Sequence, residues 1–527
     1  MARGTELSDW GSLLADLARH APSPDAPVEW RIHDKTHLEA ALDLPVASEP
    51  KRYRWEAYFF VPESFRLDSA TYDKKAIYED LHSYVRLSLA PTTLEQLARL
   101  EPGASLFLLR AAMAEAVGRL GADPRVELAS RHLRLFASRV RAGAIDDMRA
   151  LRARLASGDS AACVAEIERF VVDVRGIVVA FRGVAAELDD APMAEDLRVA
   201  SRWVDEDISL VLESVCASLG LDLQRLAASG GADADRLLAP TRALAETATL
   251  EARHRAMRGY SSIARAGATP RELEQLEWRR HMLKRFTSSV LWLRFEVRQG
   301  AGWVSQTLYA LAAAIAMSFA FAASTQSSMM GEHVFRYATL DIVSYALKDR
   351  IKATLQNVFS RWIDRRFPDR RWTIRDRERS RDVGTVHERA GFVEWAGLPS
   401  EVLGLRRRTR EHAIEEHARP EKVLWHDKRF DISPVAGKGD AEAPMLTEIF
   451  RLNLKQWLEH TDDPKRRVAF ADPADGRLHA MTARRVYNIS VVYRLAPEDA
   501  HGDRSGAWHR VRLVVSRKGI ERLDPIV

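Results

Sequence analysis

One pair of residues has the spacing that helical bundles use to build carboxylate-bridged metal sites. Glu251 and His254 stand three positions apart, so both would project from one face of a helix. Such a site needs a second pair on another helix, and the nearest candidate, Glu277 with His281, is spaced by four. A solvated helix face is therefore the favoured interpretation.

The remaining acidic clusters and the thiols receive similar interpretations. Asp189-Asp190 and Asp205-Glu206-Asp207 carry enough charge for a divalent cation, but charge on a wet surface is the simpler expectation. Cys163 and Cys216 lie inside helical patterns and are expected to be core residues. Two cysteines exclude a disulfide framework and favour a reducing compartment.

Motifs for nucleotide, zinc or acyl-transfer chemistry are missing from the sequence. The histidines at 387, 412, 417 and 426 match no zinc spacing. No G-x-x-x-x-G-K-[ST], H-E-x-x-H or G-x-S-x-G occurs, and GKGD at Gly437 to Asp440 is typical of a turn. The sequence therefore predicts no catalytic, cofactor-binding or metal-binding residue.

The most informative element is an uncharged segment from Trp303 to Ala323, in a chain of which 29% is charged. Its length is close to the ~20 residues that cross a ~30 Å hydrocarbon layer as a helix. Its insertion should be favourable by about 2 to 3 kcal/mol. A buried central helix of a soluble bundle is the alternative. The side chains expected to form the span are Trp303, Leu308, Leu311, Ile315, Phe319 and Phe321.

A weaker apolar segment follows at Val334 to Leu347. Asp341 near the middle of this segment would oppose membrane insertion by about 2.5 to 3.5 kcal/mol, which is about equal to the favourable contribution of the segment's apolar residues. Two features reduce that cost. Arg336 can snorkel outward, and Asp341 can turn toward Ser318 or Tyr309 of the first segment.

Basic residues flank the two segments but are missing from the connector at 324–333. Since Lys and Arg favour the cytoplasmic side, both flanks are expected there. A tightly connected or re-entrant helical hairpin over 301–347 is therefore predicted, with both termini cytoplasmic. The flanking residues are Lys284, Arg285, Arg294 and Arg298 before the hairpin, and Lys348, Arg350, Lys352, Arg361, Arg365 and Arg366 after it.

Small residues form two ladders along the first segment. Ala312, Ala316 and Ala320 repeat every fourth position, and Ala314, Ser318 and Ala322 lie beside them. One ladder is expected to pack on the second helix, near Asp341, and the other is available to a second subunit. An equally weighted alternative is that alanine is simply abundant here.

The stretch from Arg361 to Asp382 is rich in arginine and punctuated by Trp362, Phe367 and Trp372. Beneath a membrane it suits anionic headgroups, at about 1 kcal/mol for each exposed basic residue. Its acidic residues make ordinary Arg–Asp surface pairing a strong alternative, and nucleic-acid binding is the weakest one. The residues expected to face headgroups are Lys348, Arg350, Lys352, Arg361, Arg365, Arg366 and Trp362.

Composition agrees with a multidomain bacterial protein. The chain has 527 residues, which predicts two to four folded units, and its net charge of +5 is modest. Only 13 of the 79 basic residues are Lys, a bias typical of a GC-rich genome. The N-terminus lacks the apolar core of a signal peptide, and a helix capped by Ser8 is expected there.

Periodicity divides the rest of the chain. Strands are predicted at Val28–Asp34 and Tyr53–Pro62, followed by a helix carrying Ile77, Leu81 and Val85. The region to about residue 300 is helical, with a heptad seam from Val164 to Leu188, a second helix to about Val215, and a last helix from Arg271 to about Arg298. One long helix is predicted over Val334–Arg366.

Beyond Pro368 the period changes to two, which predicts antiparallel strands. Strands are expected at Val486–Leu495, His509–Ser516 and Ile520–Leu523, with two more joined by the turn at Asp472 to Gly476. One short helix is expected around Thr447 to Leu458. The predicted domains are an N-terminal helix and linker (1–27), a small α+β module (28–91), a helical bundle (92–300), the hairpin (301–347), a juxtamembrane stretch (348–382) and a mainly β domain (383–527).

YALKDRIK at Tyr345 to Lys352, following an apolar hairpin, resembles a layout found in uncharacterised bacterial membrane proteins. The segments YFFVP, TYDKKAIYEDLHSYVR and RLVVSRKGIERL are similar as well. The resemblance covers most of the chain and implies its architecture. It implies no activity and supplies no catalytic residues.

The sequence thus predicts an α+β multidomain protein of the bacterial inner membrane. The leading hypothesis is a non-enzymatic anchor, scaffold or regulatory protein, with the bilayer as one partner and a second copy or another protein as a possible one. A membrane-bound enzyme acting on a lipid or nucleotide at a site between domains is the second hypothesis. A soluble protein whose apolar helix is core is the third.

Overall fold

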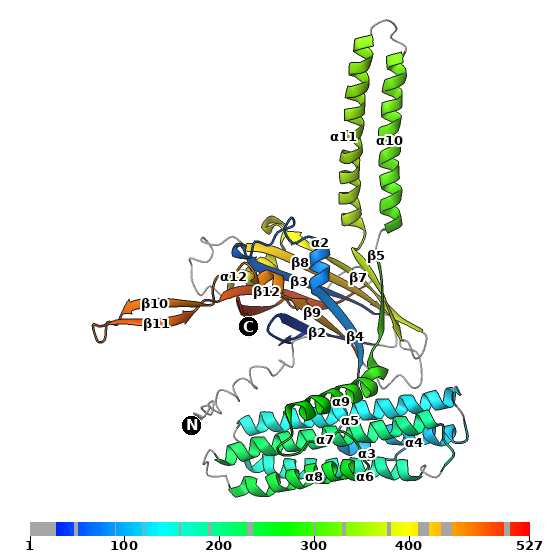
Figure 1. The fold of residues 1–527 in the computed structure, drawn as a ribbon, viewed down its shortest axis with the longest axis vertical. Helices are drawn as coiled ribbons and strands as arrows, with labels where there is room; N and C mark the ends of the chain where they lie inside the picture. Colours follow the sequence, from blue (N-terminus) through cyan, green and yellow to red (C-terminus); the bar gives the residue numbers. More distant parts are fainter. Residues whose placement is uncertain are drawn as a thin grey trace. The chain divides into compact units, whose positions relative to one another are not determined.

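The chain is a mixed α+β protein that folds into two compact units (Figure 1). A helical unit is built around Arg86–Trp292, and a β unit combines Pro27–Val85, Leu293–Gly437 and Thr447–Val527. The computed structural model describes residues 28–46, 51–89, 91–119, 121, 123–157, 160–187, 191–228, 235–299, 302–328, 334–376, 381–408, 421–433, 445–499 and 506–526. The helix expected after Ser8 lies outside these residues.

Local sequence signals explain where helices of the helical unit begin. Thr93 and Thr269 each form a capping box with the residue three positions later, and Pro270 occupies the first turn of its helix. The inward residues of the long helices pack into one core that contains the predicted seam positions Ile167, Val174 and Phe181. The helices are α3 (Leu94–Ala98), α4 (Ser105–Ala116), α5 (Pro124–Ser157), α6 (Ser160–Glu187), α7 (Glu195–Ala228), α8 (Leu238–Met257) and α9 (Pro270–Ser288), with short 3-10 turns at Asp235–Leu237 and Ser289–Leu291.

The β unit is organised by an eight-stranded antiparallel sheet in the order β14-β13-β12-β3-β8-β7-β6-β5. Its two central strands come from opposite ends of the sequence, since β3 pairs with β12 on one side and with β8 on the other. The strands are β3 (Lys51–Pro62), β5 (Arg294–Gln299), β6 (Arg370–Asp376), β7 (Arg381–Val393), β8 (Glu421–Ile432), β12 (Tyr487–Glu498), β13 (His509–Ser516) and β14 (Gly519–Ile526).

A second sheet, in the order β1-β2-β9-β4, packs on one face of the first. Its strands are β1 (Val28–Ile32), β2 (His37–Pro45), β9 (Met445–Asn453) and β4 (Leu81–Ser88). Aromatic rings join the two sheets: Trp55 of β3 lies 6.0 Å from Trp30 of β1 and 6.5 Å from Phe450 of β9. Trp55 and Phe450 are fully buried and the half-buried Trp30 borders them, so these rings form the core between the sheets.

Gly519 shows how closely the ends of the two sheets approach. It has φ +135°, and a Cβ there would lie 2.2 Å from the carbonyl oxygen of Lys35, two residues before β2. The same carbonyl accepts a hydrogen bond of 2.7 Å from the amide of Ile520. Only glycine fits this backbone conformation and this contact.

Shorter elements cover the remaining faces of the β unit. α12 (Ser400–Arg408) buries Val402 against Tyr58 and Phe60 on the outer face of the large sheet. α2 (Lys74–Asp80) is capped by Asp73, and α14 (Lys455–Leu458) buries Trp457. β10 (Lys465–Ala471) and β11 (Leu478–Arg484) form a separate two-stranded sheet.

Two long helices interrupt the edge of the large sheet. α10 (Gly302–Ser328) follows β5, and α11 (Val334–Arg366) precedes β6. β5 and β6 are neighbours that pair from Arg294↔Arg375 to Gln299↔Arg370. The helical hairpin, shown side by side in Figure 1, therefore leaves and re-enters the same sheet at adjacent strands.

The division of the β regions differs from the predicted one. Residues 28–62 do not form a module apart from residues 383–527, because β1 to β3 share their sheets with β8, β9 and β12. The stretch after the hairpin also enters this sheet as β6. Local periodicity cannot reveal pairing between strands that lie hundreds of residues apart.

Three predicted helices are partly or wholly strands. Leu81–Ser88 is β4, since a spacing of four between Leu81 and Val85 puts both side chains on one face of a helix and also of a strand. The helix expected to reach Arg298 ends at Ser288 and is followed by β5. Thr447–Asn453 belongs to β9, where the buried Glu448 interrupts the apolar alternation.

Candidate functional site

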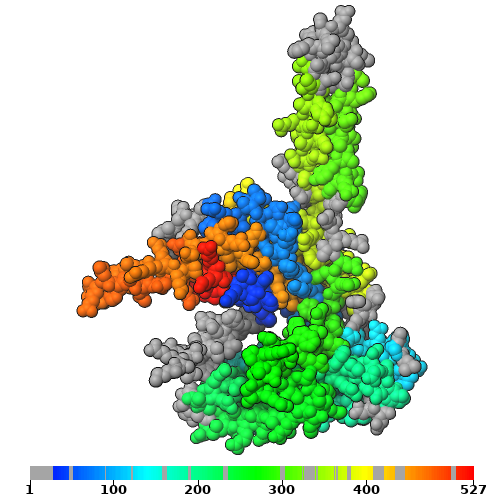
Figure 2. All heavy atoms as spheres, in the orientation of Figure 1, coloured from blue at the N-terminus to red at the C-terminus, as the bar shows by residue number. Residues whose placement is uncertain are grey.

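The α10–α11 hairpin carries most of the residues singled out from the sequence. Over Trp303–Ala322, α10 has a mean hydropathy of 1.5, yet only 11% of its most apolar window is buried. Trp303 is 76% exposed and Phe321 72% exposed, and Leu311, Ile315 and Phe319 are exposed as well. Figure 2 shows the outer surface of both helices on one side. Leu308 is half-buried.

The first alanine ladder forms the contact between the two helices. Ala312 and Ala316 are fully buried and Ala320 is half-buried, while Ser344 is the buried residue of the apolar part of α11. Ser318 is exposed with Ala314 and Ala322 on the other side of α10. Small residues therefore let the helix backbones approach closely on one face of α10. The side chain of Asp341 lies outside the described part of the chain.

The expected headgroup-facing residues follow along α11. Arg350, Lys352, Trp362 and Arg366 are exposed. Lys348 is half-buried and lies over the ring of Tyr345, with its Nζ 3.9 Å from the ring centre. Nothing is described of the Arg361 and Arg365 side chains. Among the described residues, α10 is the one helix with the length and apolar composition of a membrane span.

Glu251 and His254, the pair with metal-site spacing, belong to a buried ion-pair network in the helical unit. His254 Nε2 lies 2.7 Å from Asp205 Oδ2, and the Tyr260 hydroxyl donates to the same oxygen at 3.0 Å. The Arg182 guanidinium donates to Asp205 at 2.9 Å and to both oxygens of Glu251 at 3.1 and 2.7 Å. The guanidinium occupies the space between the carboxylates where a cation would bind, so the pair is structural.

The acidic run at 205–207 is buried, which corrects the expectation of a wet surface. Glu206 accepts two hydrogen bonds from Arg279, of 3.2 and 2.6 Å. Asp207 pairs with Arg141 and accepts from the Thr287 hydroxyl at 2.9 Å. Burial opposes ionisation of Asp205, but the hydrogen bond from His254 and the charge of Arg182 outweigh it and lower the pKa of the carboxyl.

A second buried network lies between the two sheets of the β unit, and the sequence gave it no role. Lys428 Nζ donates to Ser83 Oγ at 2.6 Å, pairs with Glu448 and lies 3.4 Å from Glu388 Oε1. Glu388 also accepts from Trp372 Nε1 at 3.0 Å and contacts His426 Nε2 at 2.9 Å. His426 and Lys428 stand at every second position of β8, in line with the apolar Leu424 and Phe430. This spacing could have indicated that both polar side chains face the core.

Hydrogen bonding fixes the tautomer of His426. The Trp55 indole, which can only donate, lies 3.2 Å from His426 Nδ1, so this nitrogen accepts and Nε2 carries the proton toward Glu388. Burial opposes ionisation of Glu388, but Lys428 and the hydrogen bonds of His426 and Trp372 prevail and lower its pKa to about 2. Every polar group that Glu388 contacts donates to it, which is the arrangement of a structural carboxylate.

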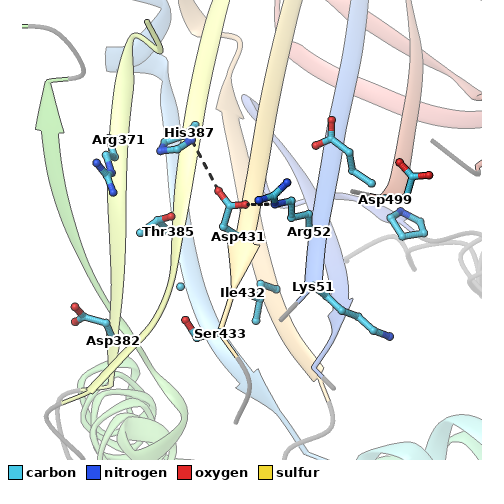
Figure 3. A pocket seen from close by; sticks show the side chains of 13 residues that line it. Lys51, Arg52, Arg371, Asp382, Thr385, His387, Asp431, Ile432, Ser433 and Asp499 are labelled. Atoms are coloured by element: carbon cyan, nitrogen blue, oxygen red, sulfur yellow. Dashed lines mark ion pairs between the residues drawn. The ribbon is translucent and has the colours of Figure 1, made fainter. Parts of the chain in front are cut away.

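A pocket of about 850 Å³ lies at one end of the large sheet (Figure 3). Arg52 pairs with Asp431 at 3.1 Å, and His387 lies 3.9 Å from the other oxygen of that carboxylate. Lys51 and Arg371 also line the pocket. Burial lowers the pKa of His387, and although Asp431 opposes this effect, Arg371 and two further arginines add to it. The lining also includes the carboxylates of Asp382, Glu498 and Asp499, so basic and acidic groups are mixed and the pocket has no excess of cationic groups for an anion.

No protein-family model, curated protein or solved structure matches this chain.

The remaining candidate groups offer little chemistry. Asp472, Asp475 and His479 gather at the β10–β11 turn, where Asp475 Oδ2 lies 2.8 Å from His479 Nε2. Cys163 and Cys216 are buried, and burial raises the pKa of the Cys216 thiol to about 12, which opposes a nucleophilic role. Residues 412, 417 and 437–440 lie outside the described ranges. The hairpin is therefore the leading candidate site.

Proposed function

We propose that this chain is a membrane anchor and scaffold, in which the α10–α11 hairpin enters the bilayer and both units stay on one side. The exposure of Trp303–Ala322 carries this proposal, since only 11% of its most apolar window is buried. A core helix of the same composition would be covered by protein on all sides. Contiguous exposed apolar surface of this length is typical of a membrane or protein contact.

The pairing of β5 with β6 supports the same-side topology. α10 begins after β5 and α11 ends before β6, and these strands are hydrogen-bonded neighbours. A single membrane crossing would leave the two strands on opposite faces of the bilayer and break their pairing. The hairpin must therefore return to the side from which it starts. Together with the basic flanks, this favours a cytoplasmic location for both units and both termini, at a bacterial inner membrane.

The use of the buried polar groups supports a scaffold rather than an enzyme. In both units the buried carboxylates described above are held by arginine, lysine or tryptophan donors. Groups paired in this way stabilise the fold and are not poised for proton transfer.

Membrane fractionation tests the anchor. Wild-type chain should resist extraction by carbonate and high salt. Phe321→Lys replaces an exposed apolar residue in the half of α10 nearer the connector and changes the insertion energy by about 3 to 4 kcal/mol, more than the 2 to 3 kcal/mol that favours insertion. Membrane partitioning should fall more than about 100-fold. Asn357→Lys, an exposed control on α11, should keep the protein in the membrane. Wild-type protein released by salt alone would end the proposal.

A further inference from the structure

The β10–β11 ribbon is an exposed element that pairs with no third strand among the described residues; at its base Arg484 lies 3.5 Å from Glu521. Its seven residue pairs run from Lys465↔Arg484 to Ala471↔Leu478. Thirteen of its fourteen residues are exposed and His479 is half-exposed. Figures 1 and 2 show the ribbon with no other strand beside it. An isolated two-stranded ribbon is marginally stable in water, so this one is expected to gain a covering surface.

The register places a defined sequence of side chains on one face of the ribbon. Directly paired residues share a face, so Arg466, Val468 and Phe470 of β10 lie with Ala483, Met481 and His479 of β11. The rings of Phe470 and His479 stack at 5.8 Å. Val468, Phe470 and Met481 are exposed, Met481 by 64%. We call this surface the arm face.

Charge is distributed unevenly along the arm face. At its base stands Arg466, which has no ion-pair partner among the described residues. At its tip Asp475 binds His479, so the acidic group lies on the same face. Asp472 and Arg477 pair beyond Phe470 and His479 and share this face, so the tip carries two carboxylates and one guanidinium. The order from base to tip is a cation, an aliphatic pair, an aromatic pair and a tip with a net charge of about −1. This pattern is complementary to itself when two ribbons pack face to face in opposite directions.

We propose that the arm face is the contact between two copies of this chain. In a two-fold arrangement, Val468 and Met481 of each copy cover each other near the axis, and Arg466 of each meets Asp475 of the other. Other occupants fit the surface less well. On the arm face, Arg466 and Arg477 are balanced by Asp472 and Asp475, so this face has no net positive charge to attract the phosphates of nucleic acid or of anionic lipid. The other basic residues of the ribbon, Lys465, Arg467 and Arg484, lie on the opposite face.

The size of the ribbon sets the strength of this contact. Seven residues span about 24 Å at ~3.4 Å each, so the face covers well under the ~800 Å² per partner of a standard interface. The association should be weak in dilute solution and stronger where copies are concentrated. Confinement of both copies to one membrane supplies such a concentration, although the contact itself does not require the anchor.

Disulfide trapping in the full-length protein tests the proposal. Met481→Cys places a thiol near the expected axis, whereas Thr482→Cys, on the opposite face, is the geometric control. The natural cysteines are buried and do not compete. Oxidation should cross-link the Met481→Cys protein into dimers and leave the Thr482→Cys protein monomeric. Equal cross-linking of both, or none at Met481→Cys, would overturn the proposal.

Charge reversal in the Met481→Cys background separates this contact from chance collision. Arg466→Asp should lower the cross-linking rate about tenfold, since the two-fold axis repeats the lost ion pair. Arg467→Asp makes the same charge change on the opposite face and should leave the rate within about twofold. Adding Asp475→Arg to Arg466→Asp should restore the pair and the rate. Equal rates for the two aspartate variants, or no recovery in the double variant, would refute the proposed geometry.

Discussion

Replacement of Lys428 by methionine tests whether the β unit depends on its buried charges. The Lys428 ammonium lies between the carboxylates of Glu388 and Glu448, and all three side chains are 1% exposed. Methionine preserves most of the aliphatic volume and removes the charge. Two carboxylates would then share a buried space without their cation.

Two independent arguments give a similar magnitude for the loss. Removal of one partner from a buried ion pair costs about 3 to 5 kcal/mol. The pKa of Glu388 is lowered from its ordinary value of 4.5 to about 2, because Lys428, His426 and Trp372 together outweigh burial. This net shift corresponds to about 3 kcal/mol at ~1.4 kcal/mol per unit, and the charge of Lys428 is the largest favourable contribution to it. Glu388 would keep its bonds to Trp372 and His426. Glu448, whose Oε2 has no hydrogen-bond partner, should suffer most.

Hydrogen exchange read by mass spectrometry is the suitable assay, because two units need not unfold in one transition. Peptides from β7 and β8 should lose about 3 kcal/mol of protection in Lys428→Met. Lys422→Met, exposed on the same strand, should change protection by less than about 0.5 kcal/mol. Neutralising both carboxylates in the Lys428→Met background should recover most of the loss. Protection unchanged in the single variant, or no recovery in the triple one, would refute the reasoning.

Three further predictions concern other parts of the chain. Because the pKa of Glu388 is lower in the folded than in the unfolded protein, its ionised carboxylate stabilises the fold above pH 4.5, and this stabilisation is lost as the pH falls toward 2. The unfolding free energy should therefore decrease with falling pH in this window, and Glu388→Gln should make that decrease smaller. Arg182→Met removes the guanidinium from Glu251 and leaves Asp205 with His254 and Tyr260 only. It should lower the unfolding free energy of the helical unit by about 3 kcal/mol, measured by hydrogen exchange in α7, while the exposed Arg202→Met should not. Ala316→Leu overpacks α10 on α11 and should cost about 1 to 3 kcal/mol, measured as faster proteolysis of the hairpin, with the exposed Ala322→Leu as the neutral control.

Sequence periodicity predicted the elements whose faces are chemically uniform. α6 and α7 bury the apolar stripes read from the sequence, and α11 spans Val334–Arg366 as expected. β12, β13 and β14 contain the three strands predicted there, and the turn at Asp472–Gly476 joins β10 to β11 as expected. In these segments local pattern and final burial coincide, so one sequence is sufficient.

The misassigned segments are those where tertiary contacts override the pattern. β9 turns Glu448 toward the core, and only Lys428 on another strand makes that burial favourable. The acidic run at 205–207 is expected to be solvated until Arg182, Arg279 and Arg141 are brought to it from three other helices. Partners that lie 20 to 73 residues away in the sequence leave no local signal. The sequence pattern of a single helix or strand therefore does not predict which charged side chains of this fold are buried.

The charges of α11 decide how the proposed hairpin can sit in a membrane. Lys348 lies fourteen residues after the start of α11, and Ala314 lies fourteen before the end of α10, so antiparallel packing puts them at about the same level. Lys348, Asp349, Arg350 and Lys352 would thus accompany the middle of the apolar helix, at about 2.5 to 3.5 kcal/mol each, against a gain of 2 to 3 kcal/mol for α10. The pairing of β5 with β6 prevents α11 from staying behind. This face of α11 must therefore meet headgroups, water or protein, which favours a hairpin that enters with its connector foremost and keeps Lys348 to Lys352 near the lipid surface.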